Sequence, residues 1–297
     1  MTLEMFFQHC FNALTLGSLY ALIAIGYTMV YGILRLINFA HGDILMLGAY
    51  FVFFGTFAYG WPWGVAAVIA IAGASVVGVA VERIAYRPLR EAPRISALIS
   101  AIAVSFFIES LAVVLFTGQP KPVVQPEWLL SEWTLGNVRI LKLTAFVPLI
   151  TAALVAVLLY VLYRTKPGLA MRAISKDIET TRLLGVKVDN IIAFTFCIGS
   201  ALAAASGIMW ALRYPQVHPY MGIMPGLKAF IAAVFGGIGS VQGAVIGGLV
   251  LGFVEIMTVA FLPELSGYRD AFAFILLVLI LVFKPTGLLG ERLEEKI

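Results

Sequence analysis

Nine apolar runs, bounded by charged residues, proline or glycine clusters, account for most of this chain. Most of them have about 20 residues, the length that an α-helix needs to cross the hydrocarbon core of a bilayer. We therefore expect an all-α polytopic membrane protein with about nine (eight to ten) transmembrane helices. The runs are Ala13–Leu34, Phe39–Tyr59, Trp63–Val81, Ser96–Phe116, Leu143–Leu162, Ile191–Leu212, Leu227–Gly236, Gly243–Leu262 and Ala271–Phe283.

A glycine-rich stretch, GGIGSVQGAVIGG at residues 236–248, extends from the end of the seventh run into the start of the eighth. The seventh run has only ten residues, which is too few to cross a membrane alone. We therefore expect a Gly-broken or re-entrant pair of short helices, enclosed by protein, because lipid does not tolerate non-helical backbone. The spacing of Gly243 and Gly247 suits close helix packing, and a role in a moving gate is the alternative. The candidate gate residues are Gly236, Gly237 and Gly239.

The composition supports a membrane protein. Hydrophobic residues make up 61% of the chain and charged residues 12%, with a mean hydropathy of +0.99, whereas soluble domains average about 25% charged residues. In water such a chain would expose too much apolar surface. We expect one transmembrane domain over residues 1–297, with no second soluble domain. The net charge of +4 is spread over short loops and does not indicate nucleic-acid binding.

Lysine and arginine are distributed unequally between the two sets of loops: fourteen lie in one set and six in the other. Because loops rich in these residues stay in the cytoplasm, we expect the N-terminus outside and the C-terminus in the cytoplasm. No basic residue precedes Arg35, so a signal peptide is not indicated and the first span should be retained. The fourteen are Arg35, Arg83, Arg87, Arg90, Arg94, Arg164, Lys166, Arg172, Lys176, Arg182, Lys187, Lys284, Arg292 and Lys296, and the six are Lys121, Arg139, Lys142, Arg213, Lys228 and Arg269.

One loop, residues 164–190, is long, charged and helical in pattern. It carries six of the twenty basic residues of the chain. Apolar side chains recur at helical spacing along one face, as at Ile174 and Ile178, and Gly185 provides a C-terminal stop. We predict one amphipathic helix, Leu169–Leu184. On these residues alone it either lies on anionic lipid or is held by a protein partner.

Polar residues interrupt the apolar runs at a few points. Asn38, His41 and Asp43 crowd between the first two runs, where they could bind a substrate or relay protons. The structural alternative is that Asn38 caps the following helix and Asp43 adds favourable charge to its first turn. Glu109 and Glu255 lie deep in apolar runs, and acids at such depth are candidates for the transport pathway. Hydrogen bonding between helices is the alternative for both.

The remaining polar residues do not indicate an enzyme. Cys10 and Cys197 lie in apolar segments and form neither a disulfide framework nor a metal site. The chain has only three histidines, no Ser/His/Asp set and no HExxH sequence, so we expect no catalytic residues and no bound metal. Glu82 lies close to a loop, where we expect it to pair with Arg83 or Arg87.

Three segments together form a specific combination. YGILRLINFAHGDILMLGAY, RTKPGLAMRAISKDIETTRLLGV and GLKAFIAAVFGGIGSVQGAVIGGLVLG, in this order and spacing, resemble the LivH-type permease of bacterial branched-chain amino-acid ABC transporters. The resemblance runs from about Asn12 to Gly287. It implies a permease subunit of an ATP-driven importer that moves leucine, isoleucine, valine or related small polar solutes across the inner membrane.

The resemblance also implies the partners: a second related permease, two cytoplasmic ABC ATPases and a periplasmic solute-binding protein, within membrane lipid. ATP would be bound and hydrolysed by the ATPases, and this chain would carry no cofactor. The resemblance implies that the helix in the charged loop is a coupling helix, which binds in a groove of an ATPase. Its most characteristic positions are Arg172, Ala173, Asp177, Leu184 and Gly185, and we expect Ile174 and Ile178 to supply the apolar anchor.

A proton-coupled secondary transporter of a small solute is the alternative to an ATP-driven importer. Its proton path would use His41, Asp43, Glu109 or Glu255, and it would work without ATP. The residues in the spans do not select one solute over another.

Overall fold

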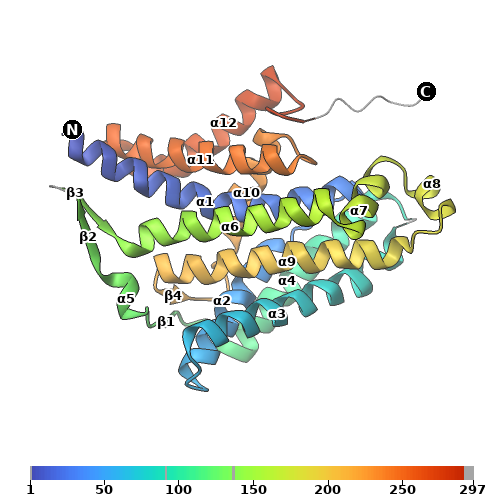
Figure 1. Cartoon of the computed structure of the whole chain (residues 1–297), viewed down its shortest axis with the longest axis horizontal. Coiled ribbons are helices and arrows are strands. Elements are labelled where there is room, and N and C mark those ends of the chain that lie inside the picture. The colour runs from blue at the N-terminus through green and yellow to red at the C-terminus, as the bar shows by residue number, and fades with distance from the viewer. Residues whose placement is uncertain (1, 91, 136–137, 291–297) are drawn as a thin grey trace.

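The computed structural model describes residues 2–90, 92–135 and 138–290, and helices dominate these ranges (Figure 1). Each of the nine apolar runs contains a helix, as predicted. These helices are α1 (Leu3–Leu34), α2 (His41–Phe57), α3 (Trp63–Val81), α4 (Arg94–Phe116), α6 (Lys142–Arg164), α9 (Val188–Arg213), α10 (Ile223–Gly236), α11 (Val241–Phe261) and α12 (Arg269–Phe283).

Within the described ranges, seven helical segments are long and apolar enough to cross a membrane. They contain α1, α3, α4, α6, α9, α11 and α12, with α3 extended by a π-helical turn, η1 (Glu82–Tyr86), and a 3₁₀ turn, η2 (Arg87–Leu89). A further 3₁₀ turn, η3 (Pro263–Tyr268), precedes α12. The apolar helices α2 and α10 are shorter, with 17 and 14 residues. The multi-pass character predicted from the sequence is therefore confirmed by seven spans.

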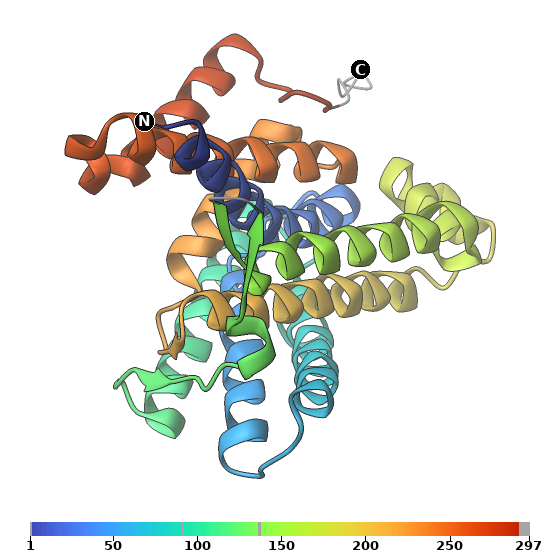
Figure 2. The ribbon, with the colours of Figure 1, turned by 60° about the vertical axis from the view of Figure 1, so that its left-hand side comes forward.

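Short elements lie at the two ends of the bundle. At the end nearest the N-terminus are α5 (Glu127–Leu130), the strand pair β1 (Lys121–Pro122) and β4 (Gln216–Val217), and the hairpin of β2 (Glu132–Leu135) and β3 (Val138–Leu141). In this hairpin Trp133 lies opposite Ile140, and residues 136–137 between the two strands are outside the described residues. At the other end, which we call the α7 end, lie α7 (Lys166–Lys176) and α8 (Ile178–Leu183) (Figures 1 and 2).

Helix α1 is the centre of the bundle. In its most apolar 18-residue stretch 94% of the residues are buried, against 6% for the segment that contains α12. It packs most closely on α11, where glycines remove the side chains between the two backbones. A Cβ atom at Gly248 would overlap the backbone of Ala21, and one at Gly252 would overlap the backbone of Gly17. Small residues favour such contacts in lipid, where apolar burial alone does not drive helices together.

The short helices α2 and α10 meet inside the bundle. Gly42, in the first turn of α2, touches the backbone of Gly222, which precedes α10. His41 lies against Gly26 of α1 and close to Gly199, near the midpoint of α9. Helix α2 therefore begins in the interior, and it then crosses α9 at a steep angle (Figure 2). Helix α2 is short because it starts well inside the bundle.

The predicted glycine break is present between α10 and α11. Gly237 and Gly239 have φ angles of 107° and 99°, a region that side-chain-bearing residues rarely adopt. The backbone amides of Leu288 and Leu289 donate to the carbonyls of Phe235 (2.9 Å) and Gly236 (2.8 Å). These bonds satisfy carbonyls at the α10 C-terminus that would otherwise lack partners.

The expectation that both helices of this pair are short is wrong for α11, which has 21 residues. The glycines in its first half do not break it. Gly243 packs on Gly236 of α10 and Gly247 on the backbone of Ala232, so both allow close approach between helices. The cost of glycine within a helix, about 1 kcal/mol relative to alanine, is offset by this contact.

We expect Gly248→Leu to destabilise the chain, because its side chain would force α11 away from α1. Overpacking of this kind costs about 1–3 kcal/mol, and the melting temperature of the purified chain in detergent should fall by several degrees. Gly64→Leu is the matched control, because a Cβ atom at Gly64 meets nothing within 4 Å. Equal melting temperatures for the two variants would contradict the proposed role of this contact.

Candidate coupling site

The charged loop forms two helices, α7 and α8, where we predicted one. Helix α7 begins at Lys166, with Pro167 in its first turn, so the predicted start at Leu169 is three residues late. The interruption is at Asp177, whose φ and ψ angles of −157° and 113° are extended. The predicted stop at Gly185 is confirmed by its positive φ angle of 82°.

Asp177 ends one helix and starts the next. One of its carboxylate oxygens accepts hydrogen bonds from the amides of Glu179 (3.0 Å) and Thr180 (3.1 Å), and the other accepts from the Thr180 hydroxyl (2.8 Å). Aspartate is a favoured N-cap because it satisfies amides that lack partners in the first turn. The interruption is therefore encoded at Asp177, although helical periodicity continues across it.

The apolar face of α7 points into the chain. Ile174 is only 1% exposed and Met171 is 3% exposed, and both belong to the main core cluster. Ile178 is partly buried against the same cluster. Ile174 therefore attaches the loop to its own bundle and is not exposed to a partner groove, whereas an anchoring role for the partly buried Ile178 stays a prediction.

Other side chains of the loop point outward. Leu183 is 88% exposed and Leu184 is 77% exposed, at the end of α8. Leu169 is exposed on α7, and the Arg172 guanidinium lies 5.1 Å from the ring centroid of Tyr163. We call Leu169, Arg172, Leu183 and Leu184 the outer surface of the loop. Two neighbouring exposed leucines beside a glycine turn form an apolar projection that a partner protein could cover.

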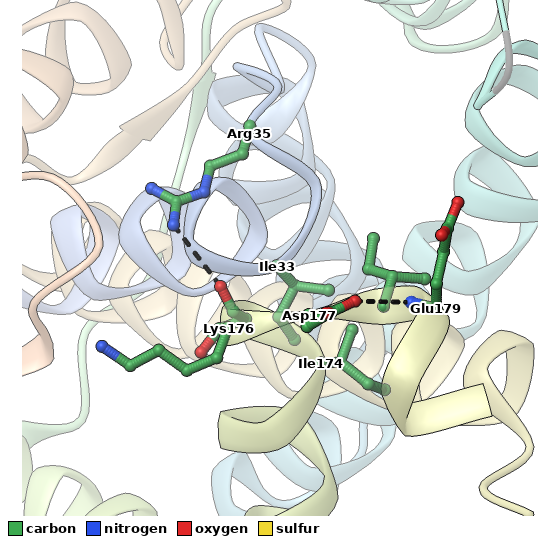
Figure 3. A pocket seen from close by; sticks show the side chains of 8 residues that line it. Ile33, Arg35, Ile174, Lys176, Asp177 and Glu179 are labelled. Atoms are coloured by element: carbon green, nitrogen blue, oxygen red, sulfur yellow. Dashed lines mark hydrogen bonds between the residues drawn. The ribbon is translucent and has the colours of Figure 1, made fainter. Parts of the chain in front are cut away.

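A cleft separates the α7–α8 junction from the end of α1. It has a volume of about 380 Å³ and is lined by Ile33 and Arg35 on one side and residues 174–179 on the other (Figure 3). Arg35 reaches over the cleft, and its Nη2 atom donates to the Ser175 carbonyl at 3.4 Å. The loop is thus joined directly to the end of the most buried helix.

Ion pairs hold α3 and α9 together beside the loop. Asp189, in the first turn of α9, binds Arg87 at 2.5 Å and Arg90 at 2.6 Å. Arg90 also pairs with the buried carboxylate of Glu82. The predicted pairing of Glu82 with Arg83 or Arg87 is therefore wrong. The π-helical and 3₁₀ turns after α3 change the helical spacing, and they bring Arg90 back to Glu82.

Asn38 and His41 are both buried, with side chains 2% and 1% exposed. The Tyr86 hydroxyl donates to the Asn38 side-chain oxygen at 3.0 Å, which ties the segment before α2 to the end of α3. Asn38 does not cap α2, because Ala40 occupies the N-cap position. The His41 ring packs 4.7 Å from the ring of Tyr27. Both residues therefore have packing partners within this chain.

The buried acids fall into two separate groups. Asp43 lies in the first turn of α2, as predicted, and accepts a 2.6 Å hydrogen bond from Ser105 of α4. Glu109 lies one turn further along α4 and is 7% exposed. Glu255 lies elsewhere, on α11. The predicted acids therefore have different partners, with Asp43 bonded to Ser105 and Glu255 to Tyr20 and Lys228.

Glu255 belongs to a network that joins four helices. It accepts a hydrogen bond from the Tyr20 hydroxyl at 2.8 Å and binds the Lys228 ammonium at 2.8 Å. Lys228 also lies 2.6 Å from Asp270, and Arg269 lies 3.6 Å from Glu255. Our sequence reasoning missed Tyr20, Lys228 and Asp270 as its partners. The available signal was Lys228, a lone charge within a short apolar run. No group of three or more metal-ligating side chains occurs among the described residues.

We expect Lys228→Met to destabilise the chain more than Lys228→Met combined with Glu255→Gln. The single variant leaves the buried Glu255 carboxylate with the Tyr20 hydroxyl and the more distant cation of Arg269, and breaking a buried pair costs about 3–5 kcal/mol. The double variant removes both charges and retains a hydrogen-bond acceptor for Tyr20. Melting temperatures in detergent measure the difference. A double variant less stable than the single one would show that the ion pair itself is not the source of stability.

Long apolar helices, buried charges paired between helices and a structured loop at one end define a polytopic membrane protein. Residues 9–281 match the family described as branched-chain amino acid transport system / permease component, and the chain belongs to this family.

Relatives match along nearly the whole chain. The high-affinity branched-chain amino acid permease LivH of Escherichia coli K12 is 42% identical over 306 residues, which cover 98% of each chain. The corresponding permease BraD of Pseudomonas aeruginosa is 40% identical with the same coverage. A solved structure of PsaBC from Streptococcus pneumoniae in complex with a Fab aligns over 93% of this chain and 91% of that one, with a TM-score of 0.49 and 12% identity.

Proposed function

We propose that this chain is a membrane permease subunit of an ATP-driven importer of branched-chain amino acids. The observation that carries the proposal is the 42% identity to LivH over 98% of both chains. A match of this extent includes the spans, the charged loop and the glycine-broken pair together. The family membership does not favour a proton-coupled secondary transporter, which would need no such loop.

The whole chain, residues 1–297, acts as one permease domain in this proposal, with α2 and α10 completing nine crossings. The α7 end faces the cytoplasm, the N-terminus lies outside and the C-terminus inside, in a bacterial inner membrane. The unequal distribution of basic residues supports this orientation, although Arg292 and Lys296 are outside the described residues. ATP is bound and hydrolysed by two partner ATPases, and a second related permease and a periplasmic binding protein complete the importer.

The outer surface of the loop is proposed as the contact with an ATPase. Leu183 and Leu184 are strongly exposed, and Gly185 sets the turn beside them. On α7, Arg172 is exposed and Ala173 is partly exposed. Ile174 has a different role, because it fixes α7 to the core. A displacement of α8 would then pass through Asp177 to α7 and from Arg35 to α1. Coupling requires a contact whose free energy differs between the nucleotide states of the partner.

We expect ATP-dependent uptake of leucine, isoleucine and valine in proteoliposomes that contain this chain, the second permease, both ATPases and the binding protein. Uptake should stop when ATP is omitted and should continue when a protonophore removes the proton gradient. Uptake that needs a proton gradient and no ATP would support a secondary transporter. Small amides and urea, tested in the same vesicles, would define the range of solutes.

The orientation has its own test. In a chain whose Cys10 and Cys197 are replaced by alanine, we expect a cysteine at the exposed position Glu179 to react with a membrane-impermeant thiol reagent only in inverted vesicles. A cysteine at Glu132, at the opposite end, should react only in intact spheroplasts. Labelling of Glu179→Cys from outside would reverse the proposed topology.

We expect Leu183→Asp combined with Leu184→Asp to insert normally and to lose co-purification of the ATPases. Both side chains are exposed, so the substitutions do not disturb the core, but they place charge in a contact that should be apolar. Leu130→Asp, at an exposed position of the opposite end, is the matched control and should retain the ATPases. Unchanged co-purification in the paired variant would remove these leucines from the interface.

A further inference from the structure

A second cavity lies beside the loop, between the end of the α3 extension and the start of α9. It has a volume of about 480 Å³ and is lined by residues 186–190 together with Arg87 and Arg182. Three of its side chains are cationic (Arg87, Arg182 and Lys187) and only Asp189 is acidic. This cavity is separate from the cleft at Arg35, and the contacts of the outer surface described above do not use it.

The charges in this cavity are not balanced within the chain. Asp189 is already neutralised by Arg87 at 2.5 Å and Arg90 at 2.6 Å. Among the described residues, neither Arg182 nor Lys187 forms an ion pair. Two cations therefore face the cavity without an acidic partner, and they would attract an anion with several oxygen acceptors.

The position of the cavity indicates the source of the anion. Arg87 lies near the end of one candidate membrane span, Trp63–Leu89, and Val188 begins another, Val188–Arg213. The cavity is thus level with the place where two spans leave the apolar layer. Lipid headgroups occupy this level, whereas Leu183 and Leu184 lie on the loop outside the spans. Basic pockets between spans at this depth suit anionic lipid headgroups.

We propose that this cavity binds the phosphate group of an anionic phospholipid, held by Arg182 and Lys187, with Arg87 also in its lining. The bound lipid would place its acyl chains along the ends of α3 and α9 and its headgroup beside α8. It would add a contact to the segment between α8 and α9, which Val186 and Val188 already pack against the core. The proposal does not depend on the transported solute.

The test is native mass spectrometry of the full chain in detergent, titrated with phosphatidylglycerol or with phosphatidylcholine of the same acyl chains. We expect phosphatidylglycerol to bind at least fivefold more tightly, and Arg182→Gln combined with Lys187→Gln to remove most of this preference. Arg139→Gln combined with Arg213→Gln, at the opposite end of the bundle, is the matched control and should keep it.

Four results would overturn the proposal. The first is equal binding of the two lipids by the unmodified chain. The second is an unchanged preference in the Arg182 and Lys187 variant. In the third, the double variant still binds lipid but no longer binds inorganic phosphate, which would assign the cavity to a free anion. If the double variant keeps its lipid preference but loses the ATPases on co-purification, the basic residues belong to the protein interface.

Discussion

Close backbone contact around α1 is the constraint on which the rest of the bundle depends. Lipid is as apolar as the helix surfaces, so the spans gain little from burying leucine against leucine. They gain instead from dispersion contacts between backbones, which require glycine at the crossing points. Gly17, Gly248 and Gly252 provide these contacts between α1 and α11. Once these helices are in place, the short helices α2 and α10 have a surface against which their first turns can begin in the interior.

Buried charge is accommodated in three different ways. Glu255 has a lysine and a tyrosine from neighbouring helices, and Glu82 has an arginine that returns to it after two irregular turns. Asp43 has the hydroxyl of Ser105, with no ion pair to a basic side chain among the described residues. The first arrangement cross-links helices, and in the second Arg90 also binds Asp189 of α9. The third leaves a carboxyl in the interior, which is the more unusual arrangement in a membrane protein.

Most of the helices could be predicted from the sequence because a run of about 20 apolar residues has few alternatives to a spanning helix. The bounds of α3 were predicted to the residue. The glycine break before α11 was also predictable, since Gly237 and Gly239 need positive φ angles. The split of the charged loop was not, because the helical spacing of Met171, Ile174 and Ile178 continues across Asp177. Periodicity identifies a face, and it cannot tell whether that face meets the same chain or a partner.

The candidate site could be predicted only in outline, because periodicity does not show what a helix face contacts. The loop was located correctly by its charge, but its apolar face was assigned to a partner and belongs to the core. The outer surface depends on Leu183 and Leu184, and only Leu184 had been singled out. Long-range pairs such as Lys228 with Glu255 depend on the crossing of distant helices, which no local pattern specifies. The resemblance to known permeases supplied the family, and the structure supplied the distinction between anchoring and exposed residues.

The bonds from Leu288 and Leu289 to the end of α10 have a consequence for the order of assembly. These residues are synthesised about fifty positions after the helix that they complete. Until they leave the ribosome and the translocation machinery, the carbonyls of Phe235 and Gly236 lack these two donors, and the glycine turn beside them is not held. The formation of these two backbone hydrogen bonds would then be a late step in maturation. Nascent chains stopped before residue 288 should accumulate with α10 and α11 already inserted but without these bonds at the end of α10.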